Sequence, residues 1–464
     1  MPVRSSESNT IFGFNNYIIH TYGVIVYMRR IGATVFLTLF LLVFVPFLTV
    51  HAEYTPDFAV NAEAVYMVNL DTEAVLYQKN AAKQVYPASL TKIMTTILAL
   101  ENTADLDGTI VRCGGTVWDE FKGMNISNAG IIPGEDRTMR DLVYCMMLPS
   151  ANEAASIVAS YVGGSRSDFT AMMNKKAQEI GAVNTNFVNP HGLHSPDHYT
   201  TALDMYLLTR YAMKLPGFMD IASTNTYTLE ASNKRGTQYI RTTNRMQVQG
   251  SDSYYPYVKG IKTGTTEEAG RCFISTATKN GYTYLIVMLG APYGTAADGY
   301  NENAAFTESR KLYDWAFNNF VVKDLLNNEQ PTTEVPLKLN WDKDYLYLRP
   351  ESSFSALVPA NAGEDDVIQR IIIPSFINAP VKKGDVIGSV ELMVMGEKVG
   401  SVRLLADEDA ERSDILYILE VVKASTKSVW FYVGLVAFVL LLMLMILGSI
   451  VSSRSRGPKF NGRR

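Results

Sequence analysis

The chain has 464 residues, 47% of them hydrophobic, and a formal net charge of −4 at pH 7. This length allows one full globular domain and a smaller one. The slightly acidic balance does not suggest a surface built for nucleic acid, so no nucleic-acid partner is expected. The three cysteines, Cys113, Cys145 and Cys272, allow at most one internal disulfide. Cys145 and Cys272 lie in apolar segments and are expected to be small buried residues rather than catalytic thiols.

Residues 1–52 are predicted to be an N-terminal leader. Arg29 and Arg30 precede an apolar run over residues 31–50, and Ala52 then supplies the small residue of a signal-peptidase site. Residues before Met28 do not fit the charged start of a signal peptide, so Met28 is the preferred true start. The apolar run is long enough to cross a membrane, which leaves a retained anchor as the alternative. Both interpretations predict export.

A strand hairpin is expected over residues 64–78, followed by the only S-x-x-K motif of the chain, Ser89 to Lys92. Pro87 and an apolar run over residues 93–98 indicate that the motif begins a helix. Residues three apart share a helix face, so the Lys92 amine can reach the Ser89 hydroxyl. A desolvated lysine can act as the base that activates a serine, although an isolated serine at this position would more often be a cap.

A second motif, Ser150-Ala151-Asn152, follows an apolar helical run. Thr138 and Asp141 form the pattern of a capping box at the start of that helix. Pro149 ends the helix, so Ser150 and Asn152 are expected to project from the break. The similar Ser223-Thr224-Asn225 lies in a polar stretch and is interpreted as a chance match.

Helices are predicted over residues 167–180 and 201–214, and the segment between them holds three histidines. His191, His194 and His198 could suggest a metal site. Gly192 and Pro196, however, prevent the single helical face that would present these ligands together. No metal is expected, and a loop over the active site is the preferred interpretation.

The third motif is Lys262-Thr263-Gly264, in a strand-like run that begins at Tyr257. Gly264 would let a substrate backbone approach the strand closely. Two further strands follow at 273–277 and 284–289, and a final helix at 306–317. Strands at both chain ends of residues 53–320 with helices between them predict an α+β fold, an antiparallel sheet flanked by helices.

The rest of the chain predicts a small all-β domain over residues 331–422, acting as a spacer, and then a transmembrane helix over 430–451. A basic tail, 452–464, follows the helix, and acidic residues precede it. The positive-inside rule therefore places the tail in the cytoplasm and the larger domain outside a cell membrane that the chain crosses once.

The three motifs, in this order, closely resemble those of the D-alanyl-D-alanine carboxypeptidases, the low-molecular-mass penicillin-binding proteins of peptidase family S11. The flanking residues 88–95, 148–155, 189–193 and 260–270 strengthen this resemblance, which extends over about residues 64–317. It implies a β-lactamase-like fold and a serine DD-peptidase that needs no cofactor. It also implies peptidoglycan stem peptides as substrates and β-lactams as covalent inhibitors.

The resemblance further implies the catalytic roles. Ser89 would attack the carbonyl between the two terminal D-alanines of a stem peptide and form an acyl-enzyme that water hydrolyses. Lys92 would be the base, and Ser150 would relay a proton to the leaving amine. The backbone N–H groups of Ser89 and Thr265 would form the oxyanion hole.

Substrate-binding roles follow from the same resemblance. Asn152 would hold the peptide amide, Lys262 would supply positive potential, and Thr263 would bind the terminal carboxylate beside Gly264. Family members often carry an arginine just before the last helix, where this chain has Ala305. Arg271 is the preferred substitute for that missing cation, and Arg310 is the alternative.

Two further residues depart from the family in the histidine loop and its following helix. His194 stands where relatives often have aspartate, and Leu203 where arginine is frequent. A β-lactamase would need a glutamate on the loop near Asn189, and none is present. The remaining alternatives are a DD-endopeptidase, a weak transpeptidase, or a penicillin-binding sensor or scaffold with little activity.

Overall fold

The structure is a computed structural model that describes residues 55–292, 303–363 and 365–454, with side chains as far as residue 450. The predicted leader over residues 1–52 lies outside the described residues, as does most of the basic tail. The proposed start at Met28 is therefore a prediction from sequence alone.

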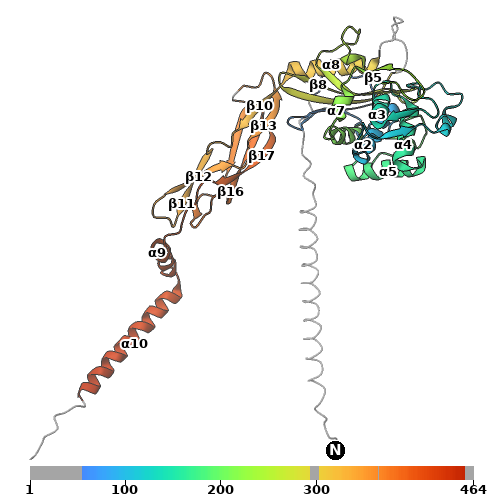
Figure 1. Cartoon of the computed structure of the whole chain (residues 1–464). Helices are drawn as coiled ribbons and strands as arrows, with labels where there is room; N and C mark the ends of the chain where they lie inside the picture. Colours follow the sequence, from blue (N-terminus) through green and yellow to red (C-terminus); the bar gives the residue numbers. More distant parts are fainter. Residues whose placement is uncertain (1–54, 293–302, 364, 455–464) are drawn as a thin grey trace, which may run out of the picture. The chain divides into compact units, whose positions relative to one another are not determined.

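The centre of the larger domain is a five-stranded antiparallel sheet (Figure 1). The predicted hairpin forms its first two strands, and the K-T-G segment lies on the edge strand β7. The strand order is β2-β1-β9-β8-β7. The strands are β1 (Ala64–Asn69), β2 (Val75–Lys79), β7 (Val258–Thr266), β8 (Gly270–Lys279) and β9 (Tyr282–Ala291).

Helices cover both faces of this sheet, which confirms the expected α+β fold. Alternate residues of β9 point to opposite faces. Leu285 and Val287 pack against one group of helices, whereas Ile286 and Met288 pack against α8 (Ala304–Asn319). The first group comprises α2 (Lys92–Asn102), α3 (Met139–Met147), α4 (Asn152–Gly163), α5 (Arg166–Ile180), α6 (Ala202–Ala212) and α7 (Phe218–Ala222).

The helix boundaries follow local capping chemistry. The predicted capping box of α3 is present, because the Thr138 hydroxyl accepts a hydrogen bond from the Asp141 N–H at 3.0 Å and the Asp141 side chain bonds back to Thr138. The side chain of Ser165 caps α5, which ends at the left-handed Gly181. The start of α3 and the end of α5 match the boundaries expected from the sequence, and α5 begins one residue earlier than expected.

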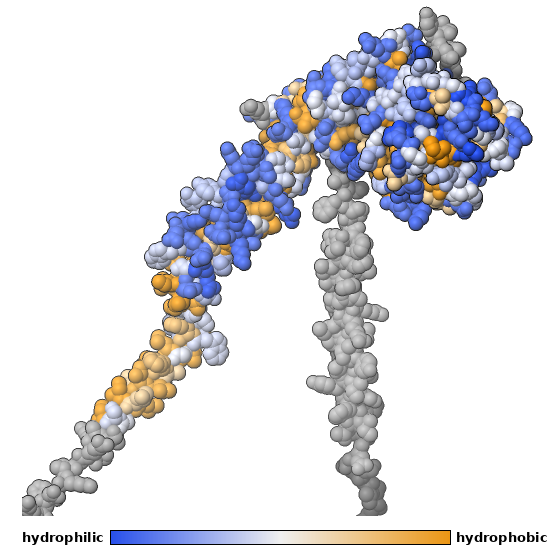
Figure 2. All heavy atoms as spheres, in the orientation of Figure 1, coloured by the Kyte–Doolittle hydropathy of each residue, from blue (hydrophilic) through white to orange (hydrophobic). Residues whose placement is uncertain are grey.

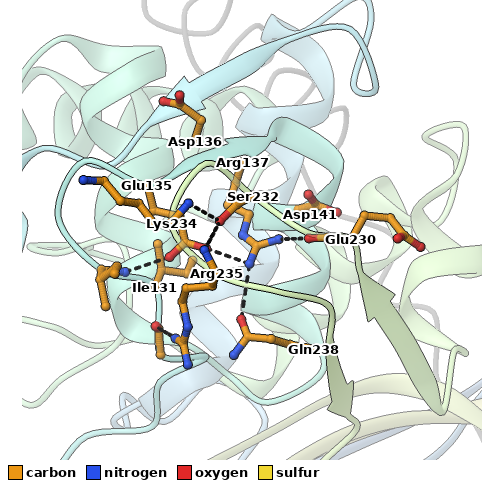
Figure 3. Close-up of polar contacts among 12 residues, drawn as sticks. Ile131, Glu135, Asp136, Arg137, Asp141, Glu230, Ser232, Lys234, Arg235 and Gln238 are labelled. Carbon is orange, nitrogen blue, oxygen red and sulfur yellow. Dashed lines mark hydrogen bonds and ion pairs between the residues drawn. The ribbon is translucent and has the colours of Figure 1, made fainter.

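Two small hairpins were not predicted. β3 (Ile110–Arg112) pairs with β4 (Asp136–Thr138), and β5 (Thr226–Leu229) pairs with β6 (Gln238–Arg241). A buried ion pair at 2.6 Å, between Glu135 and Arg137, lies where the hairpins meet (Figure 3).

Polar groups of the β5–β6 hairpin complete this ion pair. Arg137 donates to the backbone oxygen of Glu230 at 2.6 Å and to the Gln238 side chain at 3.2 Å. Ser232 donates to Glu135 at 2.9 Å. Such additional hydrogen bonds offset much of the cost of burying an ion pair, although the Arg137 Nε has no hydrogen-bond partner among the described residues. The cluster therefore fixes the β5–β6 hairpin against the β3–β4 hairpin.

The C-terminal part forms an all-β unit with its own core, as expected. Its six-stranded sheet has the order β14-β16-β17-β12-β11-β15, and β10 pairs separately with β13. Val335, Leu346, Val390 and Leu404 are among its buried residues. The strands are β10 (Phe320–Leu326), β11 (Thr333–Lys338), β12 (Tyr345–Pro350), β13 (Phe354–Pro359), β14 (Val367–Ile372), β15 (Ile377–Asn378), β16 (Val386–Val394) and β17 (Glu397–Ala406).

Two helices end the described chain, α9 (Asp414–Ser425) and α10 (Val429–Arg454). The 22 residues Val429–Ile450 have a mean hydropathy of 2.8 and are long and apolar enough to cross a membrane. Apolar side chains line α10, and they contrast with the largely hydrophilic face of the larger domain (Figure 2).

Candidate active site

Ser89 lies in a short 3-10 turn, Ala88–Thr91, that leads directly into α2. The sequence predicted one continuous helix start, and the structure instead places Lys92 as the first residue of the α-helix proper. The three-residue spacing still serves its purpose, because the Lys92 Nζ lies 2.9 Å from the Ser89 Oγ. Ala88, with a φ of 46°, holds the turn in a conformation that non-glycine residues seldom adopt.

The Lys92 amine has two further contacts, both at 2.7 Å, with the Asn152 Oδ1 and the backbone oxygen of His191. These two oxygens can only accept hydrogen bonds. A neutral amine has two hydrogens, which these acceptors take, and one lone pair. The lone pair then faces the Ser89 hydroxyl, which is the arrangement needed for removing its proton.

Burial favours the neutral form of that amine. Lys92 is fully buried, and desolvation, followed by the charge of Lys262, holds its pKa well below the usual value of 10.5, while Glu153 opposes the shift. Burial also lowers the pKa of Lys262 to about 7. Two buried lysines with lowered pKa values beside a serine are typical of a nucleophilic active site.

The S-x-N motif lies in a sharp bend between α3 and α4. Ser150 has a φ of 64°, and its hydroxyl is buried with no hydrogen-bond partner among the described residues. Backbone strain of this kind is concentrated at functional sites. The Asn152 side chain contacts Lys92, and the Asn152 backbone N–H donates to the backbone oxygen of Ser127 at 2.9 Å. The bend after α3 therefore brings the Asn152 side chain to Lys92, whereas the Ser150 hydroxyl is buried without a partner among the described residues.

Gly264 lets the edge strand β7 pack against the nucleophile turn. A Cβ atom at this position would lie 3.1 Å from the Ser89 nitrogen and 3.0 Å from the Pro87 oxygen. The structure shows that this glycine makes room for the turn that carries Ser89, and the room for substrate expected from the sequence stays a prediction. The neighbouring Thr265 is exposed on the same edge strand.

The histidine loop contacts the site through its backbone. Gly192, with a φ of 87°, lies so close that a Cβ atom there would be 1.9 Å from the Ala88 oxygen. The His191 oxygen accepts from Lys92, and the Pro190 oxygen accepts from the Thr95 hydroxyl at 2.5 Å. The loop is therefore part of the wall around the lysine.

The side chains of His194 and His198 pack against, or hydrogen-bond to, neighbouring parts of the fold. The His198 Nε2 lies 2.8 Å from the Thr91 hydroxyl, and its Nδ1 accepts from the Val188 N–H at 3.2 Å. Burial lowers the pKa of His198 to about 3, so it is neutral. The ring of His194 packs edge-on against Tyr86. Across the described ranges, no group of three histidine, cysteine or acidic residues could hold a metal ion.

The two candidate arginines have different positions. Arg271 lies on β8 directly opposite Thr265, next to the K-T-G segment. Arg310 instead donates to the backbone oxygens of Ser253, at 2.9 Å, and Tyr254, at 2.5 Å. Arg310 thus holds a loop in place, which leaves Arg271 as the better placed of the two. Ala305 is itself fully buried in the core.

Sequence reasoning missed three contributions to the site. The buried Glu153 accepts from the Ala129 N–H at 2.6 Å and so fixes the loop beside Asn152. The Thr243 hydroxyl lies 2.6 Å from that of Thr263, and the His191 backbone oxygen binds Lys92. The position of Glu153, next to the S-x-N motif, was a usable signal. A backbone oxygen and a threonine in a distant loop give none.

These features define a class of enzyme that transfers acyl groups through an activated serine. A family model described as "D-alanyl-D-alanine carboxypeptidase" (peptidase S11) matches residues 49–293, just over half of the chain. A second model, "Penicillin-binding protein 5, C-terminal domain", matches residues 324–412. The chain belongs to the D-alanyl-D-alanine carboxypeptidase family, which confirms the resemblance found in the sequence.

Named relatives agree with this assignment. The chain is 29% identical over 398 residues to D-alanyl-D-alanine carboxypeptidase DacF of Bacillus subtilis, covering 85% of this chain and 97% of the relative. The crystal structure of penicillin-binding protein 5 from Haemophilus influenzae is similar with a TM-score of 0.61 and 27% identity, over 77% of this chain and all of that one. The Streptomyces K15 DD-transpeptidase matches with a TM-score of 0.51 and 27% identity, over 57% of this chain and 99% of that one.

The two lysines predict a bell-shaped pH dependence of acylation. Lys92 must be neutral to act as a base, so activity rises with pH as Lys92 loses its proton. In its proposed role Lys262 must be charged to attract a carboxylate, so activity should fall as Lys262, whose pKa burial lowers to about 7, loses its proton. Lys262→Arg should move the alkaline limb upward, because arginine stays protonated. The pH profile of kcat/KM for a peptide substrate measures this, with the exposed Lys259→Arg on the same strand as the control. An unchanged alkaline limb in Lys262→Arg would contradict the assignment.

Proposed function

We propose that this D-alanyl-D-alanine carboxypeptidase removes the terminal D-alanine from peptidoglycan stem pentapeptides through an acyl-enzyme on Ser89. The observation that carries the proposal is the contact at 2.9 Å between the Ser89 hydroxyl and a buried lysine whose other neighbours only accept hydrogen bonds. This geometry supports proton abstraction from serine without any further cofactor. β-Lactams would acylate the same hydroxyl.

Acylation begins when Lys92 takes the Ser89 proton and the Oγ attacks the carbonyl carbon between the two D-alanines. The backbone N–H groups of Ser89 and Thr265 stabilise the oxyanion of the tetrahedral intermediate. The C–N bond then breaks, and the proton reaches the leaving amine through the Ser150 hydroxyl. Water, activated by Lys92, hydrolyses the ester and releases the shortened peptide.

Substrate binding uses the free edge of β7. An extended peptide can add to a sheet edge as a further strand, with its backbone paired to that of the edge strand. Asn152 would hold the amide before the scissile bond, whereas Lys262 and Thr263 would bind the terminal carboxylate. The exposure of Thr265 and the edge position of β7 support this placement.

Transpeptidase activity is the second candidate, because a solved neighbour, the Streptomyces K15 enzyme, is described as a DD-transpeptidase. The acyl-enzyme would then pass to an amine instead of water, with the same residues in the same roles. Analysis of the products from a wall pentapeptide, with and without an added acceptor amine, separates the two outcomes. Release of D-alanine with no amine adduct supports the carboxypeptidase.

A labelled penicillin should form one adduct, on Ser89, in the purified protein. Ser89→Ala should abolish the adduct, and Lys92→Ala should slow its formation by about 10² to 10⁴, the usual cost of a lost general base. Peptide mapping by mass spectrometry locates the adduct, and circular dichroism checks that each variant is folded. An adduct on a different residue would remove the central claim.

Arg271 is proposed to bind the substrate carboxylate in place of the family arginine that Ala305 replaces. Arg271→Ala should lower turnover of a free-carboxylate peptide by about tenfold or more, because a charge-assisted hydrogen bond is lost, and should affect an amidated peptide much less. Arg310→Ala is the matched control.

Arg245 is a second candidate cation, because it follows Thr243 by two residues and Thr243 contacts Thr263 of the K-T-G motif. A selective loss in Arg245→Ala alone would transfer the role to Arg245.

The membrane arrangement is a further part of the proposal. The apolar helix α10 would cross the membrane once, with Arg454 and the basic tail in the cytoplasm, residues 53–320 outside, and the unit at 331–422 as a spacer. Protease added to intact cells should then release a soluble, penicillin-binding fragment. Truncation before Lys427 should cause secretion. A truncated form that stays on the membrane would instead show that residues 31–50 are an uncleaved anchor.

A further inference from the structure

The side-chain hydroxyl of Thr243 forms a hydrogen bond with the side-chain hydroxyl of Thr263. Among the described residues, no other threonine does so. The two Oγ1 atoms are 2.6 Å apart, although the residues are 20 positions apart in the sequence. Thr263 is the residue proposed to bind the substrate carboxylate. The contact therefore joins the carboxylate site to a segment outside all three motifs.

The segment that carries Thr243 is held firmly against two of these motifs. The Thr243 N–H donates to the Leu148 oxygen at 3.1 Å, just before the S-x-N bend. The Asn244 side chain donates to the Gly260 oxygen at 2.7 Å, and the Gln247 side chain accepts from the Gly260 N–H at 2.7 Å, just before the K-T-G. These contacts fix the position of the Thr243 hydroxyl relative to β7.

The number of available hydroxyl protons determines which threonine donates in the Thr243–Thr263 hydrogen bond when a substrate carboxylate is bound. A hydroxyl has one proton to donate, and a carboxylate can only accept. When Thr263 donates to the substrate carboxylate, it has no proton left for Thr243. The hydrogen bond between the two hydroxyls can then persist only if Thr243 donates to the Thr263 Oγ1.

We propose that Thr243 is a positioning residue that donates its proton to Thr263 and thereby directs the Thr263 proton to the free C-terminal carboxylate of the substrate. This inference rests on the proposed function. A chain of hydrogen bonds is strengthened by mutual polarisation, so a hydroxyl that accepts one bond is a better donor in the next. The ligands that gain from this relay are peptides with a free carboxylate and penicillins, which carry a carboxylate of their own.

The relay matters in this chain because of Ala305. Where the family resemblance leads us to expect an arginine, this chain has Ala305, which is fully buried and whose side chain has no hydrogen-bonding group. Selectivity for a carboxylate must then depend more on the groups around Thr263. A polarised hydroxyl pair contributes to that selectivity without adding a charge to a site that already contains Lys92 and Lys262.

The experiment compares Thr243→Val with Thr243→Ser in the full-length protein. Thr243→Val keeps the shape but removes the hydroxyl, and should lower kcat/KM for a free-carboxylate peptide by about three- to tenfold, the value of one ordinary hydrogen bond. Turnover of the amidated peptide should hardly change, and Thr243→Ser should restore the loss. The exposed Thr226→Val on β5 is the matched control. Equal losses on both peptides would show a merely structural role and overturn the proposal.

A double-mutant cycle tests the relay itself. If Thr243 acts through Thr263, the variant Thr243→Val/Thr263→Val should be no worse than Thr263→Val alone on the free-carboxylate peptide. Additive losses would show two independent donors and would overturn the relay. Acylation of Ser89 by penicillin in every variant keeps the two ideas separate: if Ser89 is acylated and Thr243→Val has no selective effect, only the inference about Thr243 fails.

Discussion

The amine of Lys92 is the point on which the site depends. It is fully buried, and its three contacts come from the nucleophile turn, the S-x-N bend and the histidine loop. A buried amine without partners would strongly destabilise the protein. The requirement to satisfy it therefore forces these three segments into one arrangement. The same burial lowers its pKa, so one constraint both organises the site and favours the neutral amine that the proposed base requires.

Close backbone approach is the second condition for this arrangement. Gly192 and Gly264 both lie against the turn that carries Ser89: a Cβ atom would collide with the turn at Gly192 and would be tightly packed against it at Gly264. Ala88, in this turn, and Ser150, in the bend between α3 and α4, adopt left-handed conformations. Each such residue is held in place by packing around it, at a cost of about 1–3 kcal/mol. The nucleophile is thus positioned by rigid neighbours rather than by its own short turn.

The two unpredicted hairpins connect this centre to the rest of the domain. The buried pair Glu135–Arg137 fixes the β5–β6 hairpin, and the segment that follows it reaches Thr263 through Thr243. The loop that precedes β4 bonds to Glu153 and Asn152. Thr263 and Asn152 are therefore both supported by elements outside the three motifs.

The sequence alone determined the α+β fold, the three motifs, the pairing of Ser89 with Lys92 and the apolar C-terminal helix. These features depend on local spacing, capping and hydrophobic periodicity, which can be recognised within short segments of the sequence. Only the tertiary structure decided that the His191 backbone oxygen completes the lysine site, that Arg310 holds a loop, and that Thr243 contacts Thr263. These contacts join residues that are far apart in the sequence, and one of them uses a backbone group that every residue possesses. No local pattern can encode them, because they exist only once the sheet and helices have brought distant loops together.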